Sequence, residues 1–131
     1  MFQKMLQGGN ENFRFPTPKT MGNIQTYKDR VSNMSGGYFI KEKLCYLDLT
    51  FTTKSLVDAS FLLIRDIPSI IEKKSWNCLN ISAETGEANG YSNFDVYYDA
   101  DGIYGVKITA QLSQNRTYRI RCVYPTAEAD T

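Results

Sequence analysis

Residues 44–53 have the sequence LCYLDLTFTT, which is the clearest strand pattern in the chain. Cys45, Leu47, Leu49 and Phe51 occupy alternate positions, and the residues between them are mostly polar. Because successive side chains of a β-strand point to opposite faces, this alternation makes one face apolar and the other mostly polar. The stretch therefore predicts a strand that packs one side against a core.

Similar patterns recur along the chain, separated by turn-forming Gly, Pro, Asn and Asp residues. About seven or eight short strands at a spacing of roughly 8–12 residues, with almost no helix, are typical of an antiparallel sandwich or barrel. The sequence thus predicts an all-β fold, an antiparallel β-sandwich that is jelly-roll-like, with an extended N-terminal arm. The segments with strand character are residues 38–42, 44–53, 61–65, 76–83, 93–99, 104–112 and 118–124.

The expected organisation is one domain with two tails. Residues 1–34 are polar and show little alternation, which is typical of an N-terminal arm or linker. Two interpretations stay open: the arm docks on the domain or on a neighbouring copy, or it is a floppy terminus. Residues 35–125 are the predicted β-sandwich domain, opened by turn chemistry at Gly36-Gly37. Residues 126–131 are predicted to be a flexible acidic tail.

The charge and hydropathy of the chain argue against two classes of partner. A chain of 131 residues with a formal net charge of +1 has no global field that would attract nucleic acid. No apolar run approaches the roughly 20 residues needed for membrane insertion. The N-terminus lacks the apolar core and cleavage site of a signal peptide, so we expect synthesis in a cytoplasm.

Three cysteines, Cys45, Cys78 and Cys122, stand far apart in the sequence. Their spacing matches neither a zinc site nor a redox motif. We expect them to be buried free thiols that act as small hydrophobic residues.

The chain contains no histidine, which removes Ser-His-Asp and Cys-His nucleophile systems and His-ligated metals. No cofactor is expected, because the common nucleotide-binding glycine motifs are also absent. The run Asp99-Ala100-Asp101-Gly102 resembles the start of a calcium loop, but Ile103 stands where the next oxygen ligand belongs. We interpret the run as a hairpin turn and expect no metal site and no enzyme.

Three aromatic residues outside the expected core, Tyr91, Tyr97 and Trp76, are candidates for ligand binding. Flat aromatic faces pack on sugar rings, and nearby polar groups such as Asn93 and Asp95 hydrogen-bond to hydroxyls. The competing interpretation is that these aromatic residues pack between strands or against another subunit.

Arg116, Arg119 and Arg121 form a small basic stripe at the last strand. A contact with phosphate or with an acidic glycan is one interpretation, and a solvated outer face that discourages edge pairing is the other.

The order of several motifs resembles the C-terminal β-sandwich head domains of phage and prophage tail-fibre, baseplate and receptor-binding proteins. The resemblance covers about residues 35–124 and follows the order of strands and turns. The matching stretches are GGYFIK at 36–41, LCYLDLTF at 44–51, Ile67-Pro68, YDADGIY at 98–104 and YRIRCVY at 118–124.

The resemblance implies a homotrimer that joins other tail proteins in a virion and attaches it to a bacterial cell-surface saccharide. One alternative is a bacterial carbohydrate-binding or surface-interaction module. Another is a small glycan-cleaving enzyme that uses carboxylates such as Glu84 and Asp95.

Overall fold

The computed structural model describes residues 17, 20–54, 60–111 and 114–131. Over these residues the chain forms eight β-strands and one short 3-10 helix. In chain order the elements are β1 (Gln25–Thr26), β2 (Val31–Lys41), β3 (Leu44–Thr53), β4 (Leu62–Arg65), η1 (Ile71–Lys73), β5 (Trp76–Ile81), β6 (Ala88–Tyr98), β7 (Tyr104–Ile108) and β8 (Thr117–Pro125).

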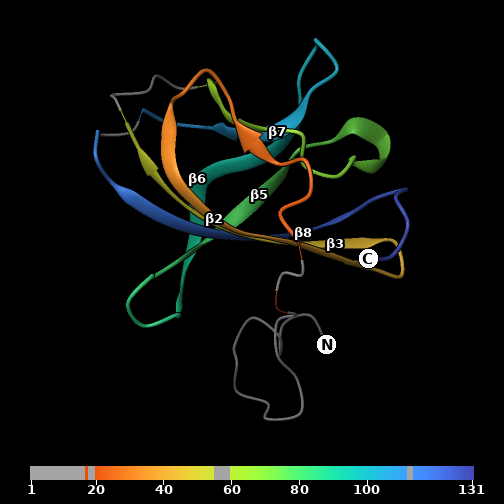
Figure 1. Ribbon diagram of the computed structural model, residues 1–131, viewed down its shortest axis with the longest axis horizontal. Helices are drawn as coiled ribbons and strands as arrows, with labels where there is room; N and C mark the ends of the chain where they lie inside the picture. The colour runs from red at the N-terminus through yellow and green to blue at the C-terminus, as the bar shows by residue number, and fades with distance from the viewer. Residues whose placement is uncertain (1–16, 18–19, 55–59, 112–113) are drawn as a thin grey trace.

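The eight strands form one antiparallel sheet in the order β1-β4-β7-β6-β5-β8-β3-β2. The sheet curls over so that its two halves face each other across the core and the shape is nearly that of a barrel (Figure 1). Phe51 on β3 and Phe94 on β6 meet edge to face, with ring centroids 5.2 Å apart. The all-β, sandwich-like fold predicted from the sequence is therefore confirmed, with β5 joining the two halves.

The alternation in residues 44–53 has the predicted effect, and β3 has the predicted bounds. β3 pairs with β8 so that the inward-facing residues of the two strands lie opposite each other and are buried. These pairs are Cys45 with Tyr124, Leu47 with Cys122, and Leu49 with Ile120.

The folded body begins earlier in the chain than the sequence indicates. β1 and the start of β2 lie within the predicted arm of residues 1–34, and β1 pairs with β4. Thr20 also forms an isolated bridge with Tyr38. Two residues of β1 carry too short a pattern to be recognised as a strand, so only the sheet partner reveals them. Residues 1–16, 18 and 19 of the predicted arm lie outside the described part of the chain.

Gly36-Gly37, which the sequence suggests as a turn, lies inside β2. A Cβ atom on Gly37 would lie 2.1 Å from the carbonyl oxygen of Thr20. The glycine therefore permits close approach of the segment around Thr20 rather than a reversal of the chain.

The last six residues, expected to be a flexible tail, are hydrogen-bonded to the β2–β3 hairpin. The amide of Thr126 donates to the Lys43 carbonyl at 3.0 Å, and the amide of Thr131 donates to the Ile40 carbonyl at 3.0 Å. The Glu42 amide donates to Asp130 Oδ1 at 3.0 Å. β2 is an edge strand, so backbone N–H and C=O groups on its outer side are available to bind these residues and hold them in place.

All three cysteines are free and buried, as predicted. Cys45 and Cys78 are fully buried in the core cluster, and Cys122 lies there with slight exposure. Among the described residues, no helix has the length and apolar character required to cross a bilayer.

Candidate functional site

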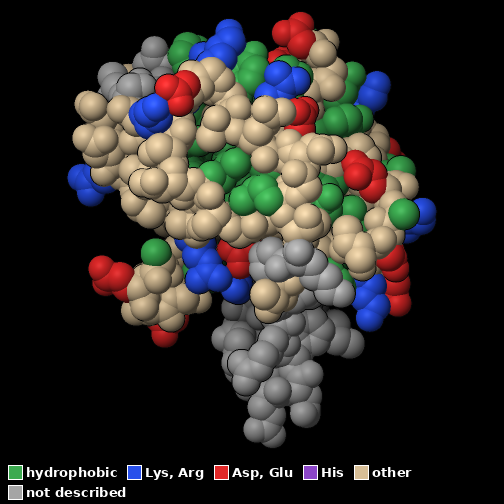
Figure 2. Space-filling view, viewed as in Figure 1, with side chains coloured by type: hydrophobic (Ala, Val, Ile, Leu, Met, Phe, Trp, Pro, Cys, Tyr) green, Lys and Arg blue, Asp and Glu red, His purple; other side chains and the backbone are tan. Residues whose placement is uncertain are grey.

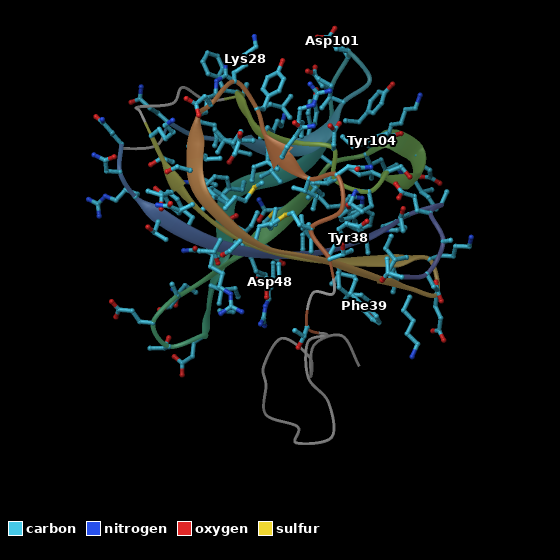
Figure 3. The ribbon with its side chains drawn as sticks, in the orientation of Figure 1. Lys28, Tyr38, Phe39, Asp48, Asp101 and Tyr104 are labelled. Carbon is cyan, nitrogen blue, oxygen red and sulfur yellow. The ribbon has the colours of Figure 1, made fainter. Side chains whose placement is uncertain are left out.

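A cleft of about 470 Å³ opens where the ends of β1, β4 and β7 approach the middle of β2. Figure 3 shows Tyr38 and Tyr104 on this side of the molecule, away from Lys28. We name it the Tyr38–Tyr104 cleft. Its lining residues are Asn23, Gln25, Tyr38, Asp66, Ile67, Pro68, Gly102, Tyr104 and Glu128.

One wall of the cleft is the segment Asp66–Pro68, which follows directly on β4. Asp66 has a φ of 64°, a left-handed conformation that turns the chain at the end of the strand and that Asp tolerates better than most residues. The Ile67 amide then donates to the Tyr104 carbonyl at 3.2 Å. The buried hydroxyl of Tyr124 donates to the Pro68 carbonyl at 2.8 Å, so this wall is fixed from the core side.

Two carboxylates from distant parts of the chain line the cleft. Asp66 accepts hydrogen bonds on Oδ2 from Gln25 Nε2 at 2.7 Å and from Arg65 Nε at 3.1 Å. Glu128 accepts on Oε2 from the Ser69 amide at 2.6 Å. These donors hold each carboxylate in place through one oxygen.

Two tyrosine rings complete the lining. The ring of Tyr38 packs so closely against Gly22 that a Cβ atom there would lie 2.6 Å from the tyrosine hydroxyl oxygen. Burial raises the pKa of Tyr38, and the nearby charge of Glu128 raises it further. The ring of Tyr104 packs against that of Tyr98, with centroids 4.9 Å apart. Because the Tyr38 hydroxyl keeps its proton at neutral pH, it is available as a hydrogen-bond donor.

The cleft therefore combines acceptor oxygens, two amide side chains, phenolic hydroxyls and ring faces. This chemistry suits a ligand that is rich in hydroxyl groups and has an apolar ring face. Within the described part of the chain, no group of three or more Asp, Glu, Cys or His side chains could hold a metal ion. The run from Asp99 to Gly102 closes a hairpin turn, in which the Gly102 amide donates to the Asp99 carbonyl at 2.8 Å.

None of the five predicted ligand-binding residues lines the Tyr38–Tyr104 cleft. Asn93, Asp95 and Tyr97 share the outer face of β6. Asp95 Oδ1 accepts a hydrogen bond from Asn77 Nδ2 at 2.9 Å. Tyr97 lines a second, smaller groove of about 340 Å³.

The structure separates Tyr91 and Trp76 from Tyr97. Tyr91 is 83% exposed and belongs to the β5–β6 hairpin, which projects from the body in Figure 1 and carries acidic side chains in Figure 2. Six residues of strand place Tyr91 roughly 20 Å from Tyr97. Trp76 is the register partner of Val96, so it lies on the opposite face of the sheet from Tyr97. The predicted residues therefore do not form one patch.

Two of the three arginines of the basic stripe are engaged within the protein, whereas Arg116 is exposed. Arg119 binds Asp48 through two hydrogen bonds of 3.1 Å, and Arg121 Nε binds the same carboxylate at 3.0 Å. Both arginines are mostly buried beside this carboxylate, so they do not present an open anion site.

The residues of the Tyr38–Tyr104 cleft carried little local signal in the sequence. Asp66-Ile67-Pro68 was recognisable only as the end of a strand, and Gly102 only as part of a turn. Their convergence depends on the pairing of β1 with β4 and of β4 with β7.

Comparison of the chain with known protein families, with curated proteins and with solved structures found no match.

Proposed function

We propose that this chain is a non-catalytic domain that attaches a phage or prophage tail to a bacterial surface saccharide through the Tyr38–Tyr104 cleft. The observation that carries the proposal is the lining of that cleft. It offers two tyrosine rings and two anchored carboxylates in a volume of about 470 Å³. Pockets of roughly 300–1,000 Å³ accommodate small organic ligands such as one or two sugar rings.

The attachment role in a virion rests on the resemblance of residues 35–124 to tail head domains. The hydroxyl-binding chemistry of the cleft is compatible with that role and equally with a bacterial carbohydrate-binding module. Both functions use the same site and the same kind of ligand. They differ in the particle or cell to which the domain belongs.

A binding role is favoured over glycan cleavage by the positions of the carboxylates first considered for catalysis. Glu84 is exposed in the β5–β6 hairpin, whereas Asp95 lies on β6 and is bound by Asn77. The cleft carboxylates Asp66 and Glu128 each accept hydrogen bonds from the protein. Neither Glu84 nor Asp95 lines the Tyr38–Tyr104 cleft, so the carboxylates first considered for catalysis do not meet at this site.

The test is calorimetric titration of the protein with saccharides released from a panel of bacterial walls. We expect Tyr104→Ala to weaken binding about tenfold, which corresponds to about 1.4 kcal/mol of lost ring and hydroxyl contact. Tyr91→Ala is the matched control, because Tyr91 is exposed on the projecting hairpin outside the cleft. Circular dichroism checks that both variants are folded. Unchanged affinity in Tyr104→Ala together with a loss in Tyr91→Ala would assign binding to the hairpin and overturn the proposal.

A further inference from the structure

The second groove lies beside the β1–β2 connection, against the outer faces of β6 and β7. Its volume is about 340 Å³, and it shares no lining residue with the Tyr38–Tyr104 cleft. We name it the Tyr97 groove. The residues that give it its chemistry are Tyr27, Lys28, Arg30, Phe61, Tyr97 and Lys107.

Each of the three cations in the groove is placed over an aromatic ring. Lys107 Nζ lies 3.8 Å from the centroid of the Tyr97 ring. Arg30 Cζ lies 4.3 Å from the centroid of Phe61, and Lys28 Nζ lies 5.4 Å from that of Tyr27. Cation–π contacts of this kind hold long flexible side chains in defined places without neutralising their charge. Where Figure 3 labels Lys28, the upper edge of Figure 2 shows a basic side chain between hydrophobic ones, and acidic side chains lie farther along the same edge.

The groove is fixed by the backbone as well as by its rings. Arg30 Nη1 donates to the Leu62 carbonyl at 2.7 Å, which anchors the guanidinium to the start of β4. A guanidinium has five N–H donors, so one such bond leaves most of its donor capacity for other groups. Leu62 itself is 6% exposed and lines the groove.

The charges of the groove are unbalanced. Lys28, Arg30 and Lys107 form no ion pair with any carboxylate in the described part of the chain. Asp99 is the one acidic residue in the lining. The lining therefore holds three cations and one carboxylate, while Asp29, next to Lys28 in the sequence, and Asp95, the register partner of Lys107, lie outside the lining.

We propose that the Tyr97 groove binds an anionic group, a phosphate or a carboxylate, carried by a glycan. This site is separate from the Tyr38–Tyr104 cleft, and its anion-binding property stands whether or not that cleft binds saccharide. A glycan is favoured over a nucleic acid because the groove is short and Asp99 interrupts its positive lining. Single-stranded nucleic acids require a long basic track and stacking platforms for several bases.

The first test uses inorganic phosphate as the probe and the width of its ³¹P resonance as the readout. We expect the protein to broaden the resonance, and Lys28→Gln and Lys107→Gln each to weaken phosphate binding about two- to fivefold, as for exposed charge pairs. Lys41→Gln is the matched control, because Lys41 is exposed on β2 outside the groove and the change in net charge is the same. Equal effects in all three variants would show an adventitious ion only and would overturn the proposal.

The second test distinguishes the sources of the anion by saturation-transfer NMR. Glucose 6-phosphate and glucuronate are expected to bind more tightly than glucose, with a preference that declines as salt is added. An oligothymidylate that bound more tightly than either charged sugar would overturn the assignment to a glycan. If wall saccharides bound without any dependence on charge, this inference would fail while the proposed function survived. If charged sugars bound only at the groove and Tyr104→Ala changed nothing, the proposed role of the cleft would fail instead.

Discussion

Asp48 shows how one side chain on the outward face of a strand can become part of the buried structure. It occupies a polar position in the alternation of β3, yet only 7% of its side chain is exposed. Arg119 and Arg121 come from the paired strand β8 and cover the carboxylate with three hydrogen bonds. Figure 3 places Asp48 on the face of the sheet that points away from the core. The ion cluster therefore joins β3 to β8 from outside.

We predict that Asp48→Asn lowers the free energy of unfolding by about 3 kcal/mol, because it leaves two largely buried guanidinium groups without their anion. Asp29→Asn is the matched control, since Asp29 forms an exposed pair with Lys54 at 2.7 Å. The control should cost under about 1 kcal/mol. Urea unfolding measures both changes. Equal losses in the two variants would contradict the structural role assigned to Asp48.

Cys45 gives the stability of the domain a dependence on alkaline pH. Burial raises the pKa of the Cys45 thiol from 9.0 to about 12. Above pH 9 the unfolded chain loses this proton while the folded chain keeps it. The contribution of Cys45 to the free energy of unfolding is therefore fully present below pH 9 and is lost as the pH rises towards 12. We expect Cys45→Ala to reduce the slope of the free energy of unfolding against pH in this range by about 1.4 kcal/mol per pH unit. Urea unfolding across the range measures the slope, and an unchanged slope would contradict the assignment.

The carboxyl-terminal segment stabilises the edge strand β2 and also contributes to the Tyr38–Tyr104 cleft. Residues 128–131 bind the β2–β3 hairpin through Asp130 and Thr131, and they bring Glu128 into the Tyr38–Tyr104 cleft. Thr131 Oγ1 accepts from the Ile40 amide at 3.0 Å. The segment thus covers backbone groups at the edge of β2.

We predict that deleting residues 128–131 lowers the free energy of unfolding by about 1–3 kcal/mol, from several hydrogen bonds that contribute roughly 1 kcal/mol each. Hydrogen exchange should become faster at the amides of Ile40 and Glu42, which lose their partners. Glu128→Gln is the control for the cleft alone and should leave these amides protected. Unchanged exchange in the deletion would show that the segment does not support the edge of the sheet.

The elements that were predictable from the sequence are those whose pattern is strong within one segment. β3 was predicted with its full bounds, because its alternation between apolar and polar residues is regular. β6 extends back to Ala88, where Asn89 and Gly90 have weak strand character and only pairing with β5 makes them a strand. β1 was not recognised in the sequence for the same reason, because only its pairing with β4 makes it a strand.

The candidate sites were less predictable because they depend on which strands pair. Tyr97 was recognised as an outward-facing aromatic residue, but its cationic neighbours come from β7 and from the β1–β2 connection. Trp76 was grouped with it, although the register places the two side chains on opposite faces. Register between segments that are distant in sequence is a property of the whole sheet, so local patterns could not reveal either site.

At the scale of the whole molecule, attachment through a shallow site would depend on multivalency. A homotrimer, which the resemblance to tail head domains implies, would present three copies of each site and raise avidity through effective concentration. We predict a light-scattering mass three times that of one chain. Whether the arm supports the trimer is best tested by deleting residues 1–16. A longer truncation would also remove residues 20–30, which include β1 and its contacts with β4. A monomeric mass for the intact chain would contradict the trimer.

The most direct test of saccharide binding at the Tyr38–Tyr104 cleft is a ¹H–¹⁵N NMR titration of the intact protein with a wall-derived oligosaccharide. The predicted result is a set of shifted amides around the cleft, centred on Gln25, Tyr38, Tyr104 and Glu128. Amides of the projecting β5–β6 hairpin, including that of Tyr91, should remain unchanged. Shifts confined to that hairpin, or no shifts with any saccharide of the panel, would contradict the proposed function.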